Sequence, residues 1–348
     1  MSQIGPAPLG GDVDRGPQAL VICWVMTAMG ILVVLMRFVG RRMIRSTGPD
    51  DWMMLLTLIL FIFFVAILTK DISIGGMRHL YYLTPDERTE AAKWSWISQP
   101  FHIMGFATGK ISVGILILRV TGSTTFWRRW ILWFAIITAL LISAVNIILT
   151  FTQCSPVEAL WNTQLVVEGK AKCWRSSIQT DFALFLSGYN ILVDLFLAFL
   201  PASFFYNLNL TWKKKVELCI LLGLGVIAAI FAAVKTTYLV ALNERSDITW
   251  ETYDLYMWSG AELFVIILCG SVPPIKPVYD YFLGKPKNRR ANNPGYGGFT
   301  SDTSYIRSSS RTSPGDRFKG REEEELELYS PSIRLDTNNA RSDSSSLP

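Results

Sequence analysis

WSWISQPFHIMGFATGKISVGILILR, residues 94–119, is long and apolar enough to cross a bilayer as a helix, yet Lys110 lies well inside it. At about 100° per residue, the large apolar side chains gather on one face: Ile97, Met104, Ile111, Ile115 and Leu118. Small and polar residues gather on the opposite face: Ser95, Ser98, His102, Gly105, Gly109 and Ser112. A lone ammonium near the middle of the hydrocarbon costs between about 2.5 and 17 kcal/mol. We therefore expect the apolar face to meet lipid, while Lys110 and the polar face meet other helices.

The composition is that of a protein that crosses a membrane several times. Half of the 348 residues are hydrophobic, 12 are Trp, and the charged residues are concentrated in short segments between long apolar ones. A soluble chain of this length would need several separate cores to bury so much apolar surface. The net charge of +5 comes from scattered basic residues, so we expect no nucleic-acid partner. With two histidines and no zinc-like cysteine spacing, we expect no metal site.

Seven apolar windows of spanning length predict an all-α bundle of seven transmembrane helices. The windows are residues 19–39, 52–69, 94–119, 130–151, 179–206, 216–242 and 253–276. They divide the chain into a short extracellular N-terminal tail (1–18), the bundle (19–283) and a C-terminal tail (284–348). The last segment is too polar to bury a core, so we expect a disordered tail.

The connectors between these windows alternate in charge, which predicts an orientation. Basic residues follow the first, third and fifth windows: Arg41, Arg42 and Arg45; Arg128 and Arg129; Lys213, Lys214 and Lys215. The other connectors are longer or more acidic. The positive-inside rule then places the N-terminus outside and the C-terminal tail in the cytosol. Cys154 and Cys173 share a connector on the oxidising side, where they are candidates for a disulfide.

Four ionisable residues lie inside the predicted helices at matching depths. We predict two ion pairs, Lys110 with Asp194 and Lys235 with Glu262. In one interpretation they only fix the register of the helices; in the other they line a ligand site, and no catalytic role is assigned. The candidate binding cavity consists of these four residues and two polar neighbours: His102, Lys110, Asn190, Asp194, Lys235 and Glu262.

Several short motifs occur in a characteristic order along residues 20–280. They are RFVGRR (37–42) with GPDDW (48–52), CSP (154–156) with Trp161, Asn190 with Asp194 and Pro201, and Glu262 through CGSVPP (269–274). In this order they resemble the fungal rhodopsin-domain integral membrane proteins. The resemblance implies a seven-helix, receptor-like protein and extends to members associated with secondary-metabolite gene clusters.

The first of these motifs has a simple physical interpretation. Asp50 and Asp51 open the second predicted helix, at the positive end of its dipole. We expect them to cap that helix and to contact the nearby arginines of the RFVGRR motif, Arg41 and Arg42 among them.

The sequence argues against retinal as a cofactor, and we expect none. Retinal attachment in rhodopsins needs a lysine midway along the seventh helix, where this chain has Glu262; Lys276 lies only at the cytosolic end. The third helix ends in Leu118, Arg119 and Val120, without the acidic-Arg-Tyr motif of animal receptors. The likeness to animal receptors is therefore one of architecture, and these motifs leave coupling to a G protein open.

The leading functional hypothesis is a receptor-like sensor of a small or lipidic ligand in the plasma membrane. Its partners would be membrane lipid, the ligand, and a cytosolic signalling protein at the basic inner loops and tail. The alternative is a membrane-embedded enzyme or accessory protein of secondary-metabolite biosynthesis, which would use the buried Asp194 and Glu262 as acids. Transport is disfavoured because the chain lacks paired halves.

Overall fold

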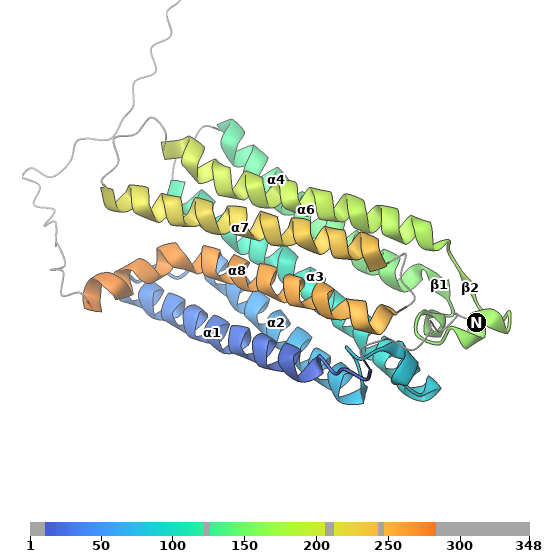
Figure 1. Ribbon diagram of the computed structural model, residues 1–348. Helices are drawn as coiled ribbons and strands as arrows, with labels where there is room; N and C mark the ends of the chain where they lie inside the picture. The colour runs from blue at the N-terminus through green and yellow to red at the C-terminus, as the bar shows by residue number, and fades with distance from the viewer. Residues whose placement is uncertain (1–10, 122–125, 206–211, 243–246, 283–348) are drawn as a thin grey trace, which may run out of the picture. The chain divides into compact units, whose positions relative to one another are not determined.

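The computed structural model describes residues 11–121, 126–205, 212–242 and 247–282. Within them, seven helices are long and apolar enough to cross a membrane, so the expected all-α seven-helix bundle is confirmed (Figure 1). The expected tail at 284–348 and most of the N-terminal tail lie outside the described residues. The seven helices are α1 (Gly16–Met43), α2 (Pro49–Ile74), α3 (Pro85–Thr121), α4 (Phe126–Thr152), α6 (Ser176–Phe205), α7 (Trp212–Leu242) and α8 (Ile248–Phe282).

The shorter elements lie in the connectors. Two single-turn 3-10 helices, η1 (Leu80–Tyr82) and η2 (Val157–Leu160), and the short helix α5 (Gln164–Val167) lie in the α2–α3 and α4–α6 connectors. The strands β1 (Cys154–Ser155) and β2 (Lys172–Cys173) pair antiparallel, with Cys154 opposite Cys173. Following the predicted orientation, we call the end of the bundle that carries β1 and β2 the outer end.

Local sequence explains where α2 begins and ends. Pro49 occupies its first turn together with Asp50 and Asp51, and the Asp51 carboxylate accepts a hydrogen bond from the Gly48 backbone at 2.9 Å. This arrangement satisfies an N–H group and places negative charge at the positive end of the helix. The helix ends at Gly75, whose φ of 113° lies in the left-handed region that favours glycine.

Helix α3 is the most buried of the seven described spans, and this corrects the expected lipid-facing stripe at Ile111. Of its apolar span, 67% of residues are buried inside the protein, compared with 22% for α4. Ile111 is only 7% exposed, and Ile115 and Leu118 pack against the main hydrophobic core. The prediction is wrong for Ile111, whereas Ile97, Met104, Ile115 and Leu118 are only partly buried. Helices α2, α4 and α8 pack along α3, while α4 and α7 have more of their surface exposed.

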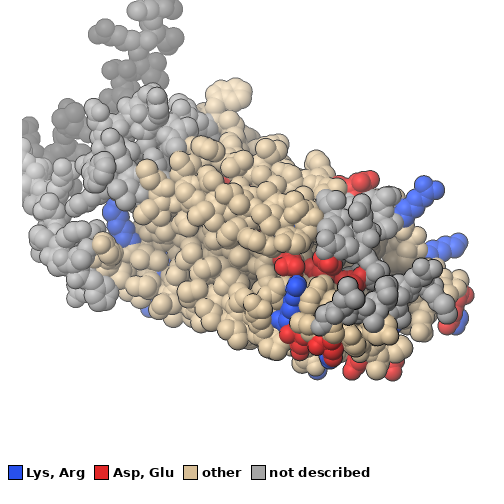
Figure 2. All heavy atoms as spheres, viewed as in Figure 1, with Lys and Arg blue, Asp and Glu red and all other residues tan. Residues whose placement is uncertain are grey.

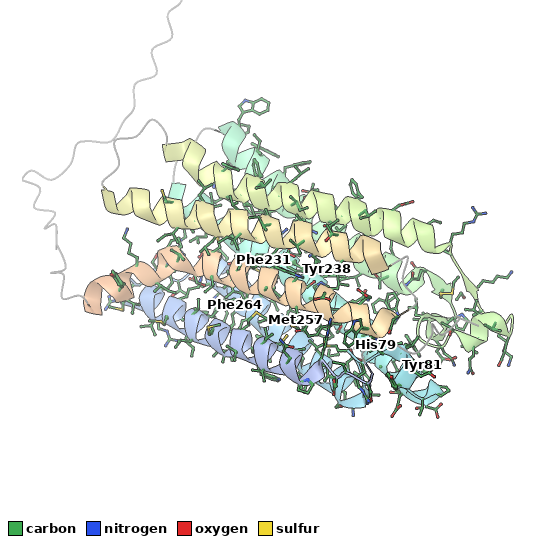
Figure 3. The ribbon with its side chains drawn as sticks, viewed as in Figure 1. His79, Tyr81, Phe231, Tyr238, Met257 and Phe264 are labelled. Atoms are coloured by element: carbon green, nitrogen blue, oxygen red, sulfur yellow. A yellow bond between two sulfur atoms is a disulfide. The ribbon has the colours of Figure 1, made fainter. Side chains whose placement is uncertain are left out.

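Charged groups collect at the outer end of the bundle. Figure 2 shows a middle zone with almost no charge on the face in view, as a bilayer requires. At the outer end, the loop after α2 is joined to the start of α8: His79 Nδ1 lies 2.6 Å from the Asp247 carboxylate, and its ring stacks on Trp250. Figure 3 shows His79 beside this end of α8. A disulfide between Cys154 and Cys173 holds the nearby α4–α6 connector.

Candidate functional site

The candidate site lies in the middle of the bundle and is built from four helices. Its residues come from α3 (His102, Lys110), α6 (Asn190, Asp194), α7 (Lys235) and α8 (Glu262). We refer to these six residues as the central polar site. Each charged member lies in a span that is otherwise apolar, so each depends on partners from another helix.

Lys110 makes the first of the two expected ion pairs. Its Nζ lies 3.0 Å from Asp194 Oδ1, and both side chains are about 95% buried. The same ammonium donates to Asn190 Oδ1 at 2.9 Å and to the Asn190 backbone carbonyl at 3.2 Å. Three acceptors therefore match the three N–H groups of the lysine, which is fully satisfied without water or ligand.

Lys235 makes the second expected pair, across the α7–α8 interface. Its Nζ lies 2.5 Å from Glu262 Oε2, with Glu262 fully buried and Lys235 14% exposed. The ammonium also lies 4.4 Å from the ring centroid of Phe106 on α3, a cation–π contact. Three helices therefore share this one charge.

The two ion pairs belong to one site because α3 contributes to both. Phe106 and Lys110 are four residues apart, which is about 6 Å along the helix axis. Glu262 interacts electrostatically with Asp194 and Lys110 as well as with Lys235. His102, one turn further toward the outer end, lies between Phe64 and Phe106 at ring distances of 5.6 and 5.3 Å.

Three polar atoms of the site are buried without a hydrogen-bond partner among the described residues. They are Asp194 Oδ2, Glu262 Oε1 and His102 Nδ1. Each carboxylate thus uses one oxygen for its lysine and leaves the other unused. A buried polar group without a partner costs about 1 to 3 kcal/mol, so such atoms mark places where a further donor would stabilise the protein.

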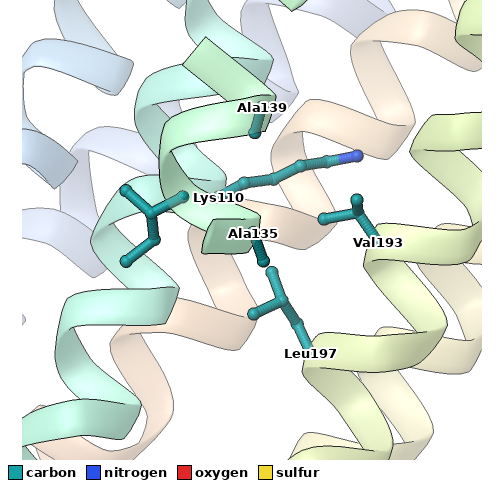
Figure 4. Close-up of a pocket in the computed structure, with 6 residues that line it drawn as sticks. Lys110, Ala135, Ala139, Val193 and Leu197 are labelled. Atoms are coloured by element: carbon teal, nitrogen blue, oxygen red, sulfur yellow. The ribbon is translucent and has the colours of Figure 1, made fainter. Parts of the chain in front are cut away.

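A narrow gap adjoins this site on the side of α4. Its volume is about 170 Å³, which includes the space at its open side. It is lined by Lys110, Ala135, Ile136, Ala139, Val193 and Leu197. Figure 4 shows the Lys110 side chain passing between Ala135 and Ala139 of α4 and Val193 of α6. The gap is too narrow to admit a water molecule, so a ligand could enter only if α4 and α6 moved apart.

A second cluster of buried charges closes the inner end of the bundle. Arg37 of α1, which is completely buried, lies 2.6 Å from Asp50 and 2.8 Å from Asp51. Arg41 lies 2.7 Å from Asp50, and Arg119 at the end of α3 lies 3.0 Å from the same carboxylate. We call these five residues the inner ion network.

The inner ion network fixes four helices to one another. Arg37 donates to the backbone carbonyl of Gly270 in α8, and Ser112 of α3 donates to the Asp50 carbonyl at 2.6 Å. The expected contact of Asp50 and Asp51 with Arg41 is present, but the one with Arg42 is not. Arg42 is exposed because it lies one residue further around α1, and no ion pair joins it to another described residue.

The inner ion network and the seven-helix architecture agree with the protein family that the sequence matches. Residues 36–281 match the Fungal rhodopsin domain. The chain belongs to the fungal rhodopsin domain family. The match begins one residue before Arg37 and ends in the last turn of α8, so it includes both charge clusters.

Curated relatives of this fungal rhodopsin domain come from biosynthesis clusters. It is 28% identical to the wortmanamides biosynthesis cluster protein C of Talaromyces wortmannii, over 74% of this chain and 68% of the relative. It is also 28% identical to the fugralins biosynthesis cluster protein 2 of Gibberella zeae, over 35% of this chain and 30% of that relative. No solved structure matches the chain.

Two residues of the inner ion network were not among the candidate site residues of this rhodopsin domain. They are Arg37 and Arg119, which both contact Asp50. A signal for Arg37 exists in the sequence: it is the first charge after a run of 21 uncharged residues, 16–36. An arginine so close to hydrocarbon needs an anionic partner, and Asp50 and Asp51 are the next acidic residues along the chain.

Proposed function

We propose that this multi-pass membrane protein is a receptor-like sensor of a small or lipidic ligand, acting in the plasma membrane. The observation that carries the proposal is the pair of ion pairs in the central polar site, each with one carboxylate oxygen unused. A ligand that meets these oxygens would change the balance between alternative arrangements of the helices.

The distribution of ion pairs supports a movement of α6 and α7 relative to α1, α2, α3 and α8. The inner ion network joins α1, α2, α3 and α8 through buried contacts at several points. Helices α6 and α7 are joined to α3 and α8 by the two mid-membrane ion pairs. A ligand between these groups would therefore move α6 and α7 relative to the others, and a cytosolic partner at the inner loops would detect the movement.

Distance measurements between these two groups of helices test this proposal. Spin labels on Arg42→Cys at the inner end of α1 and Lys214→Cys at the start of α7 would report the separation in lipid nanodiscs. We expect a fraction of a fungal lipid and metabolite extract to change this distance and to raise the unfolding temperature saturably. The response should be lost in Glu262→Gln and kept in Glu90→Gln, which changes an exposed residue of α3. Unchanged distance and stability with every fraction would reject the sensor.

A second candidate function rests on the relatives. Both are named for biosynthesis clusters, so we also consider an accessory or enzymatic role in secondary metabolism, with Asp194 and Glu262 as proton donors. In that case the purified protein should convert a component of the extract, and Asp194→Asn or Glu262→Gln should abolish conversion. A sensor returns the bound compound unchanged, which mass spectrometry distinguishes.

A further inference from the structure

We propose that the ligand of the central polar site is an electrically neutral, largely apolar molecule whose head donates hydrogen bonds through a hydroxyl or N–H group. This inference rests on the proposed sensor function and names the chemical class that the site would take. This assignment excludes ionised ligands such as alkylsulfonates and alkylammonium ions.

Charge balance is the first reason. The site holds two lysines and two carboxylates, each in an ion pair, so its net charge is zero. An anionic ligand would place a third negative charge beside Asp194 and Glu262, and a cationic one a third positive charge beside Lys110 and Lys235. An uncompensated charge is strongly unfavourable in a buried site, so a neutral ligand is preferred.

The hydrogen-bond inventory is the second reason. The unused atoms of the two carboxylates, Asp194 Oδ2 and Glu262 Oε1, can only accept while the groups are ionised. Lys110, the cation nearest the gap, has all three N–H groups bound by Asp194 and Asn190. Lys235, the other cation, donates to Glu262 and lies over the Phe106 ring. A ligand therefore gains most by bringing a donor.

The approach to the site is the third reason. Apart from Lys110, the gap is lined by alanine, isoleucine, valine and leucine side chains from α4 and α6 (Figure 4). The exposed side of α4 carries large apolar residues such as Ile137 and Leu141, as a surface in contact with lipid does. A molecule that enters from the bilayer between α4 and α6 would have an apolar body in contact with these side chains. Its polar head would then face Asp194.

Four photoreactive alkyl probes of equal chain length test the inference on the full chain in nanodiscs. They carry a hydroxyl, a methyl ether, a sulfonate or a primary amine as the head. We expect the alcohol to label α4 or α6 saturably and to bind at least about tenfold more tightly than the ether, which accepts but cannot donate. The sulfonate and the amine should label no better than the ether.

Two double variants test whether the preference for the alcohol over the ether depends on the central polar site. Lys235→Met combined with Glu262→Met keeps the charge balanced and removes one acceptor, so the advantage of the alcohol over the ether should shrink several-fold. Glu90→Met combined with Lys93→Met removes an exposed ion pair of α3 and should leave that advantage unchanged. The probe ranking on the unmodified chain tests the inference even where the first variant folds poorly.

The outcomes separate this inference from the sensor proposal. Equal or tighter binding of the ether, the sulfonate or the amine would overturn the neutral-donor assignment, as would the absence of binding by all four probes while an extract fraction still shifts the unfolding temperature. In those cases the sensor proposal stands. If no probe and no extract fraction changes stability or distance, both proposals fail.

Discussion

Lys110 shows how one residue constrains the architecture around it. Its ammonium can lie in the middle of an apolar span because Asp194 and the two oxygens of Asn190 replace its water shell. In a buried ion pair, attraction roughly repays desolvation, whereas a single remaining charge is not compensated. The contribution of the ion pair to stability is therefore measurable only when one partner is removed.

Removing Lys110 alone should destabilise the protein more than removing the whole pair. We expect Lys110→Met to lower the free energy of unfolding by about 3 to 5 kcal/mol, since it leaves Asp194 buried without a counterion. Lys110→Met combined with Asp194→Leu should recover most of this loss. Unfolding by a denaturing detergent measures both, and a double variant as unstable as the single one would contradict the argument.

Arg37 and Arg42 provide a matched comparison on one helix. Arg37→Met should cost about 3 kcal/mol or more, because Asp50 and Asp51 lose a buried partner and the Gly270 carbonyl loses its donor. Arg42→Met should change stability by less than about 0.5 kcal/mol, since its side chain is exposed. Thermal unfolding of the two variants side by side checks this, and similar losses would mean that the inner ion network contributes little.

At the scale of elements, the position of α3 depends on how closely its neighbours approach. A Cβ atom at Gly109 would lie 2.7 Å from Ile266 Cγ2 of α8, and Ile266 is itself buried. Small residues allow such close packing of membrane helices. The polar face predicted for residues 94–119 is thus also a packing face.

Glycine-to-alanine substitutions test this packing. Gly109→Ala should destabilise by about 1 to 3 kcal/mol, because Ile266 has little room to move. Gly188→Ala on α6 has nothing within 4 Å of the added methyl group, so the higher helix propensity of alanine should leave stability unchanged or raise it by up to about 1 kcal/mol. Detergent unfolding of both variants gives the comparison, and an unaffected Gly109→Ala would indicate looser contact between α3 and α8.

The outer connector is an element held by a covalent bond. Cys154 and Cys173 are 19 positions apart, and closing a loop of that size contributes about 3 kcal/mol in the chain-entropy account. Replacing both cysteines with serine should lower the unfolding temperature, and reductant should lower it for the unmodified chain only. Equal sensitivity of both proteins to reductant would exclude the disulfide as the cause.

The whole molecule has a predicted orientation that chemical labelling can test. Lys170→Cys lies in the exposed connector near the disulfide, and Arg42→Cys lies at the opposite end. A membrane-impermeant maleimide added to intact cells should label the first, and label the second only after permeabilisation. The reverse pattern would invert the orientation and place the inner ion network at the outer face.

The amino-acid sequence alone predicts the number of spans, the class of fold and the pairing of Lys110 with Asp194 and of Lys235 with Glu262. These features depend on local quantities: the transfer free energy of each window, and the depth of each charge along its own helix. For the same reason Asp50 and Asp51 were recognised as the start of a helix.

The remaining contacts between helices, and the burial of each helix, depend on the tertiary structure. It enclosed α3, so that Ile111 faces protein and not lipid, and it brought Arg119 and Gly270 to a cluster that begins at Arg37. It also left one oxygen of Asp194 and one of Glu262 without a donor. Helical periodicity gives the face of each helix but not its neighbour, because contacts between residues far apart in the chain are set by how all seven helices pack together.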